Sequence, residues 1–351
     1  MSHLTYAQAV VTGLIQGVTE LFPVSSLGHN VLLPALIGGQ WAKDLSVSAK
    51  GSPYLAFIVG LHVATALAMI LYFWRDWVRI VRGFFSSLRR REIVTADQRL
   101  AWMIVLATIP VGIAGALLQK VFITVFAKPE LTALFLAANG VILLYSERQR
   151  RARAERDSGA RAAEPVAAAG PSRGGYQGYP QGGYQGYSQQ PRQQQWQGQG
   201  QHRGHRADPR ADQTEAAVAA DRRLSVMGYG RAILVGSAQV LALLPGISRD
   251  GIVTVAGMGR GLKREDAVRF SFLLSAPVIL AAGLLKAHDL LGPAGKGIHG
   301  PVLVGSLLSF VGAYLSVRFL TRYFSESRSL NPFGIYCLVA GILSFAYLLI
   351  K

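Results

Sequence analysis

This sequence is poor in charged residues, histidine and cysteine, and each shortage excludes a class of protein or site. Only 16% of its 351 residues are Asp, Glu, Lys or Arg, whereas soluble domains carry about 25%. The single cysteine, Cys337, lies in an apolar stretch and excludes an intramolecular disulfide framework. The 7 histidines form no His/Cys cluster of the kind that binds zinc. No basic segment precedes the first apolar run, so we expect no cleavable signal peptide.

What the sequence does contain is long apolar runs. Hydrophobic residues make up 51% of the chain, and its mean hydropathy is +0.30. Six runs are near the length that crosses a bilayer of about 30 Å; they lie at residues 54–74, 101–118, 131–145, 267–287, 301–320 and 332–350. We therefore predict an all-α polytopic membrane protein with six transmembrane helices, rather than the buried helices of a large soluble protein.

Two further apolar segments are each interrupted by proline and a polar cluster. The first, at residues 5–37, contains QGVTELFPVSSLGH, and the second, at residues 229–258, contains LLPGISRDG. Both patterns predict re-entrant helical hairpins, whose irregular backbone is tolerated at membrane depth where protein or water surrounds it. Ionisable groups inside such apolar sequence are expensive, which makes them functional candidates.

Each broken segment is followed by three apolar runs, and this order indicates two repeats, at residues 1–147 and 226–351. Three is an odd number of crossings, so the second repeat would enter the membrane with inverted topology. Inverted repeats bring two such hairpins together near the midplane of the bilayer, where binding sites of membrane proteins form.

The basic residues around the apolar runs predict the orientation. The net charge is +17, and two short loops concentrate the positive charges of the membrane part: Arg75, Arg79, Arg82, Arg89, Arg90, Arg91 and Arg99 in one, and Arg260, Lys263, Arg264 and Arg269 in the other. Short loops rich in Arg and Lys stay cytoplasmic, which would place both chain ends outside. Because these charges lie at membrane boundaries, we expect no nucleic-acid partner.

Residues 148–225 differ from the rest of the chain. An Ala/Arg/Glu stretch leads into a Gln/Gly/Tyr/Arg-rich tract with few aliphatic residues. Such a composition cannot build a core, so we predict a disordered cytoplasmic linker. Its tyrosines leave weak self-association open as an alternative.

The first polar cluster contains the residue types of a catalytic site. Gln16 and Glu20 are four residues apart and share one helix face. Ser25 and Ser26 suit the N-terminus of the next helix, which is a ready site for phosphate. His29 follows one turn later, so hydroxyl, imidazole and carboxylate form a nucleophile–base–orienter set. The alternative is that the serines only cap a helix and His29 is an interfacial residue.

The second polar cluster contains the groups that hold an anion. Gly246 permits close approach of the backbone, and the planar fork of Arg249 suits phosphate. Ser248 and Thr254 add hydroxyl donors. The alternative is an ion pair of Arg249 with Asp250 that stabilises the helix break.

The two clusters, with YFWR at residues 72–75 and FSFLLSAP at 270–277, resemble the signature of the bacterial undecaprenyl-diphosphate phosphatase family, integral-membrane enzymes linked to bacitracin resistance. The resemblance covers residues 1–147 and 226–351. It implies hydrolysis of undecaprenyl diphosphate to the monophosphate carrier lipid of peptidoglycan synthesis, at the extracytoplasmic side of the plasma (inner) membrane. The chain departs from the family at Asp250, where serine is usual, at Gln16, where many members have glutamate, and in the linker.

The residues and the resemblance together predict a role in hydrolysis for each residue of the two clusters. Glu20 sits with Gln16 near a divalent cation, Mg²⁺ or Ca²⁺, or orients the acid–base group. Ser26, with Ser25 beside it, is the nucleophile or positions the scissile phosphate, and His29 is the general acid/base or itself the nucleophile. The residues expected to hold the diphosphate and its transition-state charge are Arg249, Ser248, Gly246 and Thr254, and Ser25 is also expected to bind the substrate.

The sequence leaves two other classes of function open. Inverted repeats with midplane half-helices are also features of a transporter or flippase of polyprenyl phosphate, although a carrier needs no nucleophile and base. A scaffold organised by the Gln/Gly/Tyr tract is the third reading. The expected partners are a polyprenyl diphosphate lipid and the bilayer, and a homodimer is left open.

Overall fold

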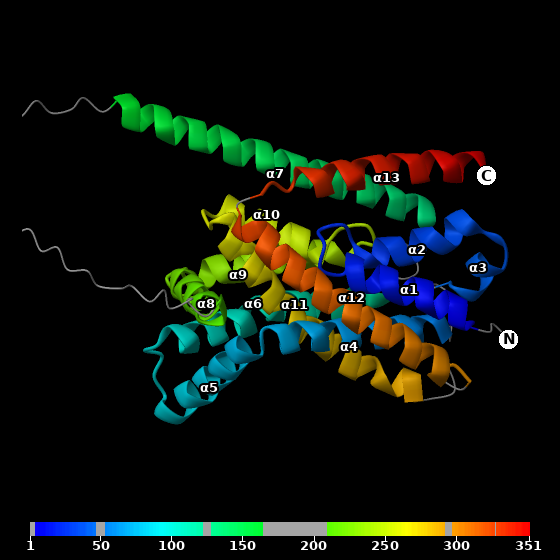
Figure 1. Ribbon diagram of the computed structural model, residues 1–351, viewed down its shortest axis with the longest axis horizontal. Helices are drawn as coiled ribbons and strands as arrows, with labels where there is room; N and C mark the ends of the chain where they lie inside the picture. The colour runs from blue at the N-terminus through cyan, green and yellow to red at the C-terminus, as the bar shows by residue number, and fades with distance from the viewer. Residues whose placement is uncertain (1–3, 47–52, 122–127, 164–208, 292–296, 327) are drawn as a thin grey trace, which may run out of the picture.

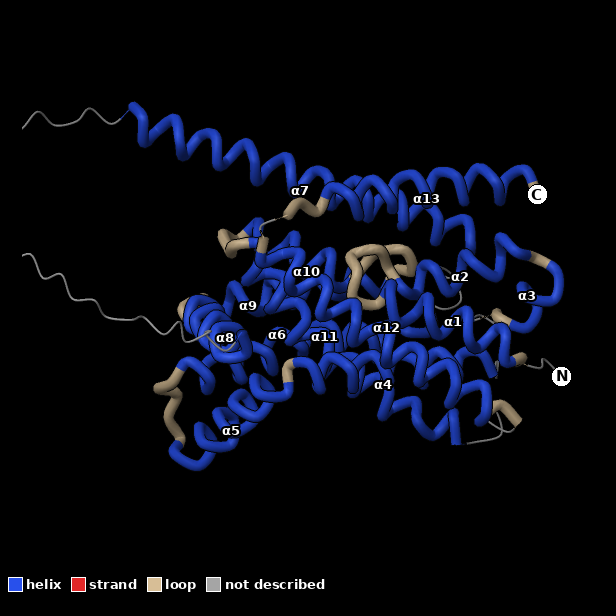
Figure 2. Tube along the Cα trace, viewed as in Figure 1, coloured by secondary structure: helices blue, strands red, loops and turns tan. Residues whose placement is uncertain are grey.

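The computed structural model describes residues 4–46, 53–121, 128–163, 209–291, 297–326 and 328–351. Every regular element in these ranges is helical (Figures 1 and 2). The elements are, in chain order, α1 (Tyr6–Thr19), α2 (Ser26–Ile37), α3 (Gly39–Asp44), α4 (Pro53–Tyr72), α5 (Trp74–Arg90), α6 (Ala96–Val121), α7 (Pro129–Ala163), α8 (Pro209–Ser225), α9 (Tyr229–Ser237), the 3₁₀ helix η2 (Ala238–Leu243), α10 (Arg249–Gly259), α11 (Arg264–Leu291), α12 (His299–Ser325) and α13 (Asn331–Ile350).

Six helices in the described part of the chain are long and apolar enough to cross a membrane, which confirms the six predicted transmembrane helices. The spans are Tyr54–Tyr72, Ala96–Leu118, Pro129–Arg156, Arg264–Leu285, His299–Ser325 and Asn331–Ile350. A further pair, Glu215–Ser225 with Tyr229–Leu243, is apolar enough when taken together but is bent by 102°.

Helices of the first half of the chain pack against helices of the second half, so the two halves do not form separate units. α1 lies on α12, α9 lies on α6, and α7 runs alongside α13 (Figure 1). Small residues permit the closest of these contacts, as in other membrane helix pairs. A Cβ atom at Gly13 would come within 2.4 Å of the Gly305 carbonyl oxygen, and one at Gly17 within 2.6 Å of that of Ser309. The internal symmetry of the two halves stays a prediction.

Both broken segments interrupt their helices near the proline. α1 ends at Thr19 and α2 begins at Ser26, while η2 ends at Leu243 and α10 begins at Arg249. Proline lacks the N–H that a helix interior requires, which accounts for the breaks at Pro23 and Pro245. The connecting segments lie in the middle of the bundle (Figure 2), where the surrounding helices cover their backbone. Their re-entrant course in a bilayer stays a prediction.

The expected linker is helical at both ends. α7 continues to Ala163, and α8 covers residues 209–225, so the prediction of disorder over 148–225 is wrong there; residues 164–208 lie outside the described part. At the α8 end, a buried ion-pair network that the composition did not reveal holds the helix on the protein. Asp221 is fully buried and accepts hydrogen bonds from Arg79 of α5 at 2.6 Å and from Arg269 of α11 at 2.8 Å.

We expect residues 164–208 to be dispensable for stability and turnover, and we expect α8 to be required for stability. Replacing 164–208 by a Gly/Ser spacer of the same length should leave thermal stability and turnover unchanged, since it leaves Asp221 in place. Removing 148–225 should destabilise the protein, because Arg79 and Arg269 lose the fully buried carboxylate of Asp221 and keep only Asp76 and, for Arg79, Asp97. Thermal unfolding of both variants in detergent checks this. Equal stability of the two would contradict it.

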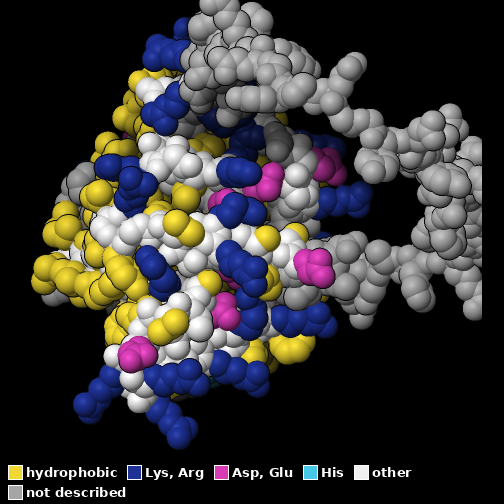
Figure 3. All heavy atoms as spheres, turned by 90° about the vertical axis from the view of Figure 1, so that its left-hand side faces the viewer, with side chains coloured by type: hydrophobic (Ala, Val, Ile, Leu, Met, Phe, Trp, Pro, Cys, Tyr) yellow, Lys and Arg dark blue, Asp and Glu magenta, His cyan; other side chains and the backbone are white. Residues whose placement is uncertain are grey.

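The first basic loop of the sequence prediction is mostly the helix α5, packed on the start of α6. The Gly83 backbone lies so close to α6 that a Cβ atom there would approach the Asp97 carbonyl carbon to 2.9 Å. Lys and Arg side chains, interspersed with Asp and Glu, gather at this end of the molecule (Figure 3).

Candidate active site

The two helix breaks meet at Ser25. Its hydroxyl oxygen accepts a hydrogen bond from the Gly28 N–H at 3.2 Å, which caps α2 as predicted, and a second from the Gly246 N–H at 3.1 Å. Gly246 has a φ of 110°, a conformation that L side chains rarely adopt. A Cβ atom there would also lie 2.5 Å from the Thr132 carbonyl oxygen. Ser25 and Gly246 therefore join the two segments.

Ser248 and Asn139 form a second connection between the breaks. The Ser248 hydroxyl oxygen accepts from the Gly251 N–H at 3.2 Å and so caps α10. The Ser248 N–H donates to Asn139 Oδ1 at 3.1 Å, and Asn139 Nδ2 donates to the Pro23 carbonyl at 2.9 Å. Asn139 is buried on α7 and was not identified from the sequence. Its signal was an amide in the apolar run 131–145.

Glu20 is the centre of the polar cluster at this junction. Its Oε2 accepts hydrogen bonds from the Ser26 hydroxyl and from Gln16 Nε2, the latter at 2.6 Å, and lies 3.3 Å from His62 Nε2. Its Oε1 accepts from Arg249 Nη2 at 2.6 Å. The Glu20 side chain is only 2% exposed, while that of Arg249 is 20% exposed. The structure thus brings together four predicted site residues, Gln16, Glu20, Ser26 and Arg249, with one that was missed.

His62 is the missed residue. It lies within the span Tyr54–Tyr72, where it is the only ionisable side chain besides the two tyrosines. Its Nδ1 lies 2.9 Å from the Ile58 carbonyl oxygen, so both ring nitrogens face acceptors. An ionisable side chain inside a span is a functional candidate by itself, and this signal was available in the sequence.

This arrangement combines a proton acceptor, a hydroxyl and an anion-binding group. The Glu20 carboxylate already holds the hydrogen of the Ser26 hydroxyl, which is the contact that general-base activation of a nucleophile requires. The guanidinium of Arg249 lies on the other carboxylate oxygen. Ser26 and Arg249 are the first residues of α2 and α10, and helix N-termini favour anions such as phosphate.

His29 lies next to this cluster but does not join it. Its Nδ1 is 2.7 Å from the Ser25 carbonyl oxygen, and its Nε2 is 2.7 Å from the Tyr336 hydroxyl. A carbonyl oxygen only accepts, so Nδ1 carries the proton and Nε2 accepts from Tyr336 in the neutral ring. His29 therefore presents a basic Nε2, masked by one tyrosine hydroxyl, and its catalytic role stays a prediction.

We expect His29→Ala to lower turnover by at least ~100-fold, the low end for a general acid–base group. The matched control is Tyr336→Phe, which removes the hydroxyl from Nε2 but leaves the imidazole and its bond to Ser25. It should retain the parent rate. Rates of phosphate release by the purified variants decide this, and a fully active His29→Ala would remove His29 from the mechanism.

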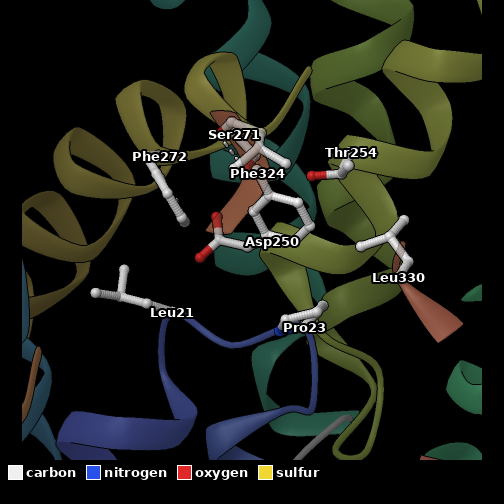
Figure 4. Close-up of a pocket in the computed structure, with 9 residues that line it drawn as sticks. Leu21, Pro23, Asp250, Thr254, Ser271, Phe272, Phe324 and Leu330 are labelled. Carbon is white, nitrogen blue, oxygen red and sulfur yellow. Dashed lines mark hydrogen bonds between the residues drawn. The ribbon is translucent and has the colours of Figure 1, made fainter. Parts of the chain in front are cut away.

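Thr254 and Asp250 take no part in the hydrogen bonds of the Glu20 cluster. Both line a small cavity with Leu21, Pro23 and Phe272, among others (Figure 4). Asp250 accepts a hydrogen bond from the Ser275 hydroxyl at 2.7 Å, whereas Arg249 pairs with Glu20. The proposed Arg249–Asp250 ion pair is therefore wrong for this structure. Among the described residues, no hydrogen bond connects Thr254 to Glu20, Ser26 or Arg249.

The residues at Glu20 do not fit a resident divalent cation. Both carboxylate oxygens of Glu20 already accept from donors, one of which is the cationic Arg249. Gln16 directs its amide nitrogen at Glu20, and its Oε1 accepts from Asn30 Nδ2 at 2.6 Å. In the described ranges no group of three or more His, Cys, Asp or Glu side chains could hold a metal ion. Ca²⁺ takes about 6–8 oxygen ligands, and Mg²⁺ binds to proteins through one or two carboxylates plus substrate phosphates. Neither carboxylate oxygen of Glu20 is free of a hydrogen bond here.

Comparison with known proteins places this site in a family context. Residues 9–168 and 208–343 match the family model described as bacitracin resistance protein BacA. The chain is 53% identical over 350 residues to the undecaprenyl-diphosphatase of Mycolicibacterium paratuberculosis, covering 100% of this chain and 99% of the relative. It is 52% identical to undecaprenyl-diphosphatase 2 of Frankia alni, covering 98% of each. It is 34% identical to undecaprenyl-diphosphatase 2 of Burkholderia lata, covering 97% and 96%.

Proposed function

Because the chain belongs to the bacitracin resistance protein BacA family, we infer that it is an undecaprenyl-diphosphatase, a multi-pass membrane hydrolase. It converts undecaprenyl diphosphate into undecaprenyl phosphate and inorganic phosphate, and thereby confers bacitracin resistance. The observation that supports this chemistry best is the Glu20 carboxylate, which holds the Ser26 hydroxyl on one oxygen and Arg249 on the other.

In the first step, the Ser26 oxygen attacks the terminal phosphorus of the diphosphate. Glu20 takes the hydroxyl proton, and the bond from the phosphorus to the bridging oxygen breaks. Undecaprenyl phosphate leaves with the bonding electrons, and the phosphoryl group remains on Ser26. Arg249 stabilises the charge on the phosphoryl oxygens, with help from the N-terminal N–H groups of α2 and α10.

In the second step, water attacks the phosphorus of the phosphoserine. His29 Nε2 accepts a proton from the water once the Tyr336 hydroxyl has moved aside. The serine oxygen leaves and regains its proton from Glu20. His29 passes the proton that it took from the water to the departing phosphate, so inorganic phosphate is released and the enzyme returns to its starting state. His62 keeps the Glu20 carboxylate in place through the contact at Oε2.

The divalent cation expected from the sequence stays a proposal. We place it with the incoming diphosphate, whose oxygens supply the ligands that the protein lacks at Glu20. Neither proton transfer described above depends on a cation held by the free protein. Equilibrium dialysis with ⁴⁵Ca²⁺ should therefore show binding only when the diphosphate is present.

The direct test is phosphate release from undecaprenyl diphosphate by the purified protein in detergent. We expect release by the parent and none above background by Ser26→Ala. Labelling with substrate carrying ³²P in the terminal phosphate should trap a phosphoserine in the parent. Absence of hydrolysis by a folded parent would leave the transporter reading in place. Hydrolysis by Ser26→Ala would assign the attack to water, with Ser26 as a positioning residue.

We further propose that the protein lies in the bacterial inner membrane with α5 and α8 in the cytoplasm and the site open to the outside. The basic residues at the α5 end support this orientation. The start of α1 and the end of α13 lie at the opposite end of the bundle, near α3 (Figure 1).

Thiol labelling checks the orientation. In a Cys337→Ser background, a cysteine at the exposed Ala42 of α3 should react with an impermeant reagent in intact cells. A cysteine at Arg90 of α5 should react only in inside-out vesicles. The reverse pattern would place the site on the cytoplasmic lipid pool.

A further inference from the structure

The helix α5 carries an exposed apolar stripe that no other described part of the protein covers. Its members repeat at spacings of four and three residues and are 37–63% exposed: Trp74, Val78, Val81, Phe85 and Leu88. At 3.6 residues per turn they fall within an arc of roughly 80°. A stripe of this size with two aromatic residues is unfavourable in water and indicates an interaction surface.

The opposite face of α5 holds the helix on the protein. Asp76, Ile80, Gly83 and Ser87 are buried there. Ser87 Oγ accepts a hydrogen bond from Trp102 Nε1 at 2.9 Å, which fixes α5 on α6. This attachment sets the rotation of α5, so the apolar stripe points away from the bundle.

Arginines follow one edge of the stripe. Arg75, Arg82 and Arg89 are seven residues apart and exposed. Arg75 lies over the Trp74 ring at 5.5 Å. Among the described residues, neither Arg82 nor Arg89 takes part in an ion pair, whereas Arg79, which turns toward the protein, pairs with Asp76, Asp97 and Asp221.

The position of α5 determines what can cover the stripe. The helix begins at Trp74, two residues after the span Tyr54–Tyr72 ends, so its start is fixed at the edge of the hydrocarbon. Its arginines prevent it from crossing the membrane. Basic side chains gather over this end of the molecule, including its lower edge, where α5 lies (Figure 3). A helix with an apolar stripe and flanking arginines at this depth matches the surface of an anionic bilayer.

We propose that α5 is an interfacial helix, with its apolar stripe in the boundary between acyl chains and head groups, and with Arg75, Arg82 and Arg89 bound to the phosphates of anionic phospholipids. This surface is separate from the Glu20 site and does not depend on hydrolysis.

The depth of α5 is tested with the full chain in nanodiscs that contain phosphatidylglycerol. In a Cys337→Ser background, spin labels replace Phe85 in the stripe or, as a control, Glu92 in the loop after α5. At position 85 we expect higher accessibility to oxygen than to an aqueous nickel complex, and the reverse at position 92. Access of nickel to position 85 would overturn the proposal. Shielding of position 85 from both reagents would also overturn it and indicate a protein partner, such as a second copy.

The head-group preference is tested by native mass spectrometry of the full chain. The parent should retain more phosphatidylglycerol than phosphatidylcholine. In Arg82→Gln/Arg89→Gln, the ratio of bound phosphatidylglycerol to bound phosphatidylcholine should fall about fivefold for each arginine removed, as expected for basic residues at an anionic surface. Arg153→Gln/Arg156→Gln on the exposed end of α7 is the matched control and should change nothing. An unchanged preference in the α5 variant would exclude arginine–lipid recognition.

Discussion

Glu20→Gln is expected to lower the rate of phosphate release by at least ~100-fold. The amide keeps the size of the side chain but cannot accept the proton of Ser26, and it removes the charge that balances Arg249. The loss should appear in kcat, since the missing interaction is with the reacting hydroxyl. Steady-state phosphate release by the purified variant in detergent measures it.

The control for this variant must separate chemistry from folding. Breaking one side of a buried ion pair costs about 3–5 kcal/mol, so thermal unfolding is recorded for each sample. Asp250→Asn is the matched substitution: it neutralises a buried carboxylate that is hydrogen-bonded to Ser275 and does not contact Ser26. It should retain turnover. Parent-like activity in a folded Glu20→Gln would refute Glu20 as the base.

Arg249→Lys is expected to be as inactive as Arg249→Ala, with turnover lowered at least ~100-fold, the scale for removal of one transition-state donor. The guanidinium offers several N–H groups, so it can keep Glu20 on one and bind phosphate with others. A lysine ammonium is a point charge that cannot reproduce this planar geometry.

Arg260→Lys provides the comparison for Arg249. Arg260 lies at the other end of the same helix, as the C-cap of α10, and is exposed. Its substitution should leave hydrolysis unchanged in the same assay. Full activity of Arg249→Lys would reduce Arg249 to a diffuse positive charge and argue against direct contact with the diphosphate.

The sequence contained most of the local information about the site. Helix breaks at proline and serine caps depend on neighbouring residues, so the ends of α1 and the start of α2 near Ser26 could be predicted. The pairing of Glu20 with Arg249 depends on how two segments more than 200 residues apart approach each other. No spacing rule predicts such a contact. Asp250, which is next to Arg249 in the sequence, was the obvious candidate for its ion-pair partner and is not the partner in the structure.

The residues that were missed show the same limit. His62 could have been identified, because an imidazole inside a span is rare enough to require a reason. Asn139 was a weaker signal, since its role becomes clear only when Pro23 and Ser248 are seen on either side of it. Asp221 looked like one more charge in a polar tract, and only the positions of Arg79 and Arg269 explain its burial.

The packing of α1 on α12 bears on how the protein is made. The glycine face of α1 leaves the ribosome first, yet its partner helix is the fifth of the six spans. Until α12 is inserted, the face with Gly13 and Gly17 has only lipid or a chaperone against it, and Glu20 has no Arg249. During most of translation, the first half of the chain must therefore stay in the bilayer without the helix that covers this face of α1. A nascent chain that stops before α10 would leave the Glu20 carboxylate without its guanidinium partner, with Ser26, Gln16 and His62 as its remaining contacts.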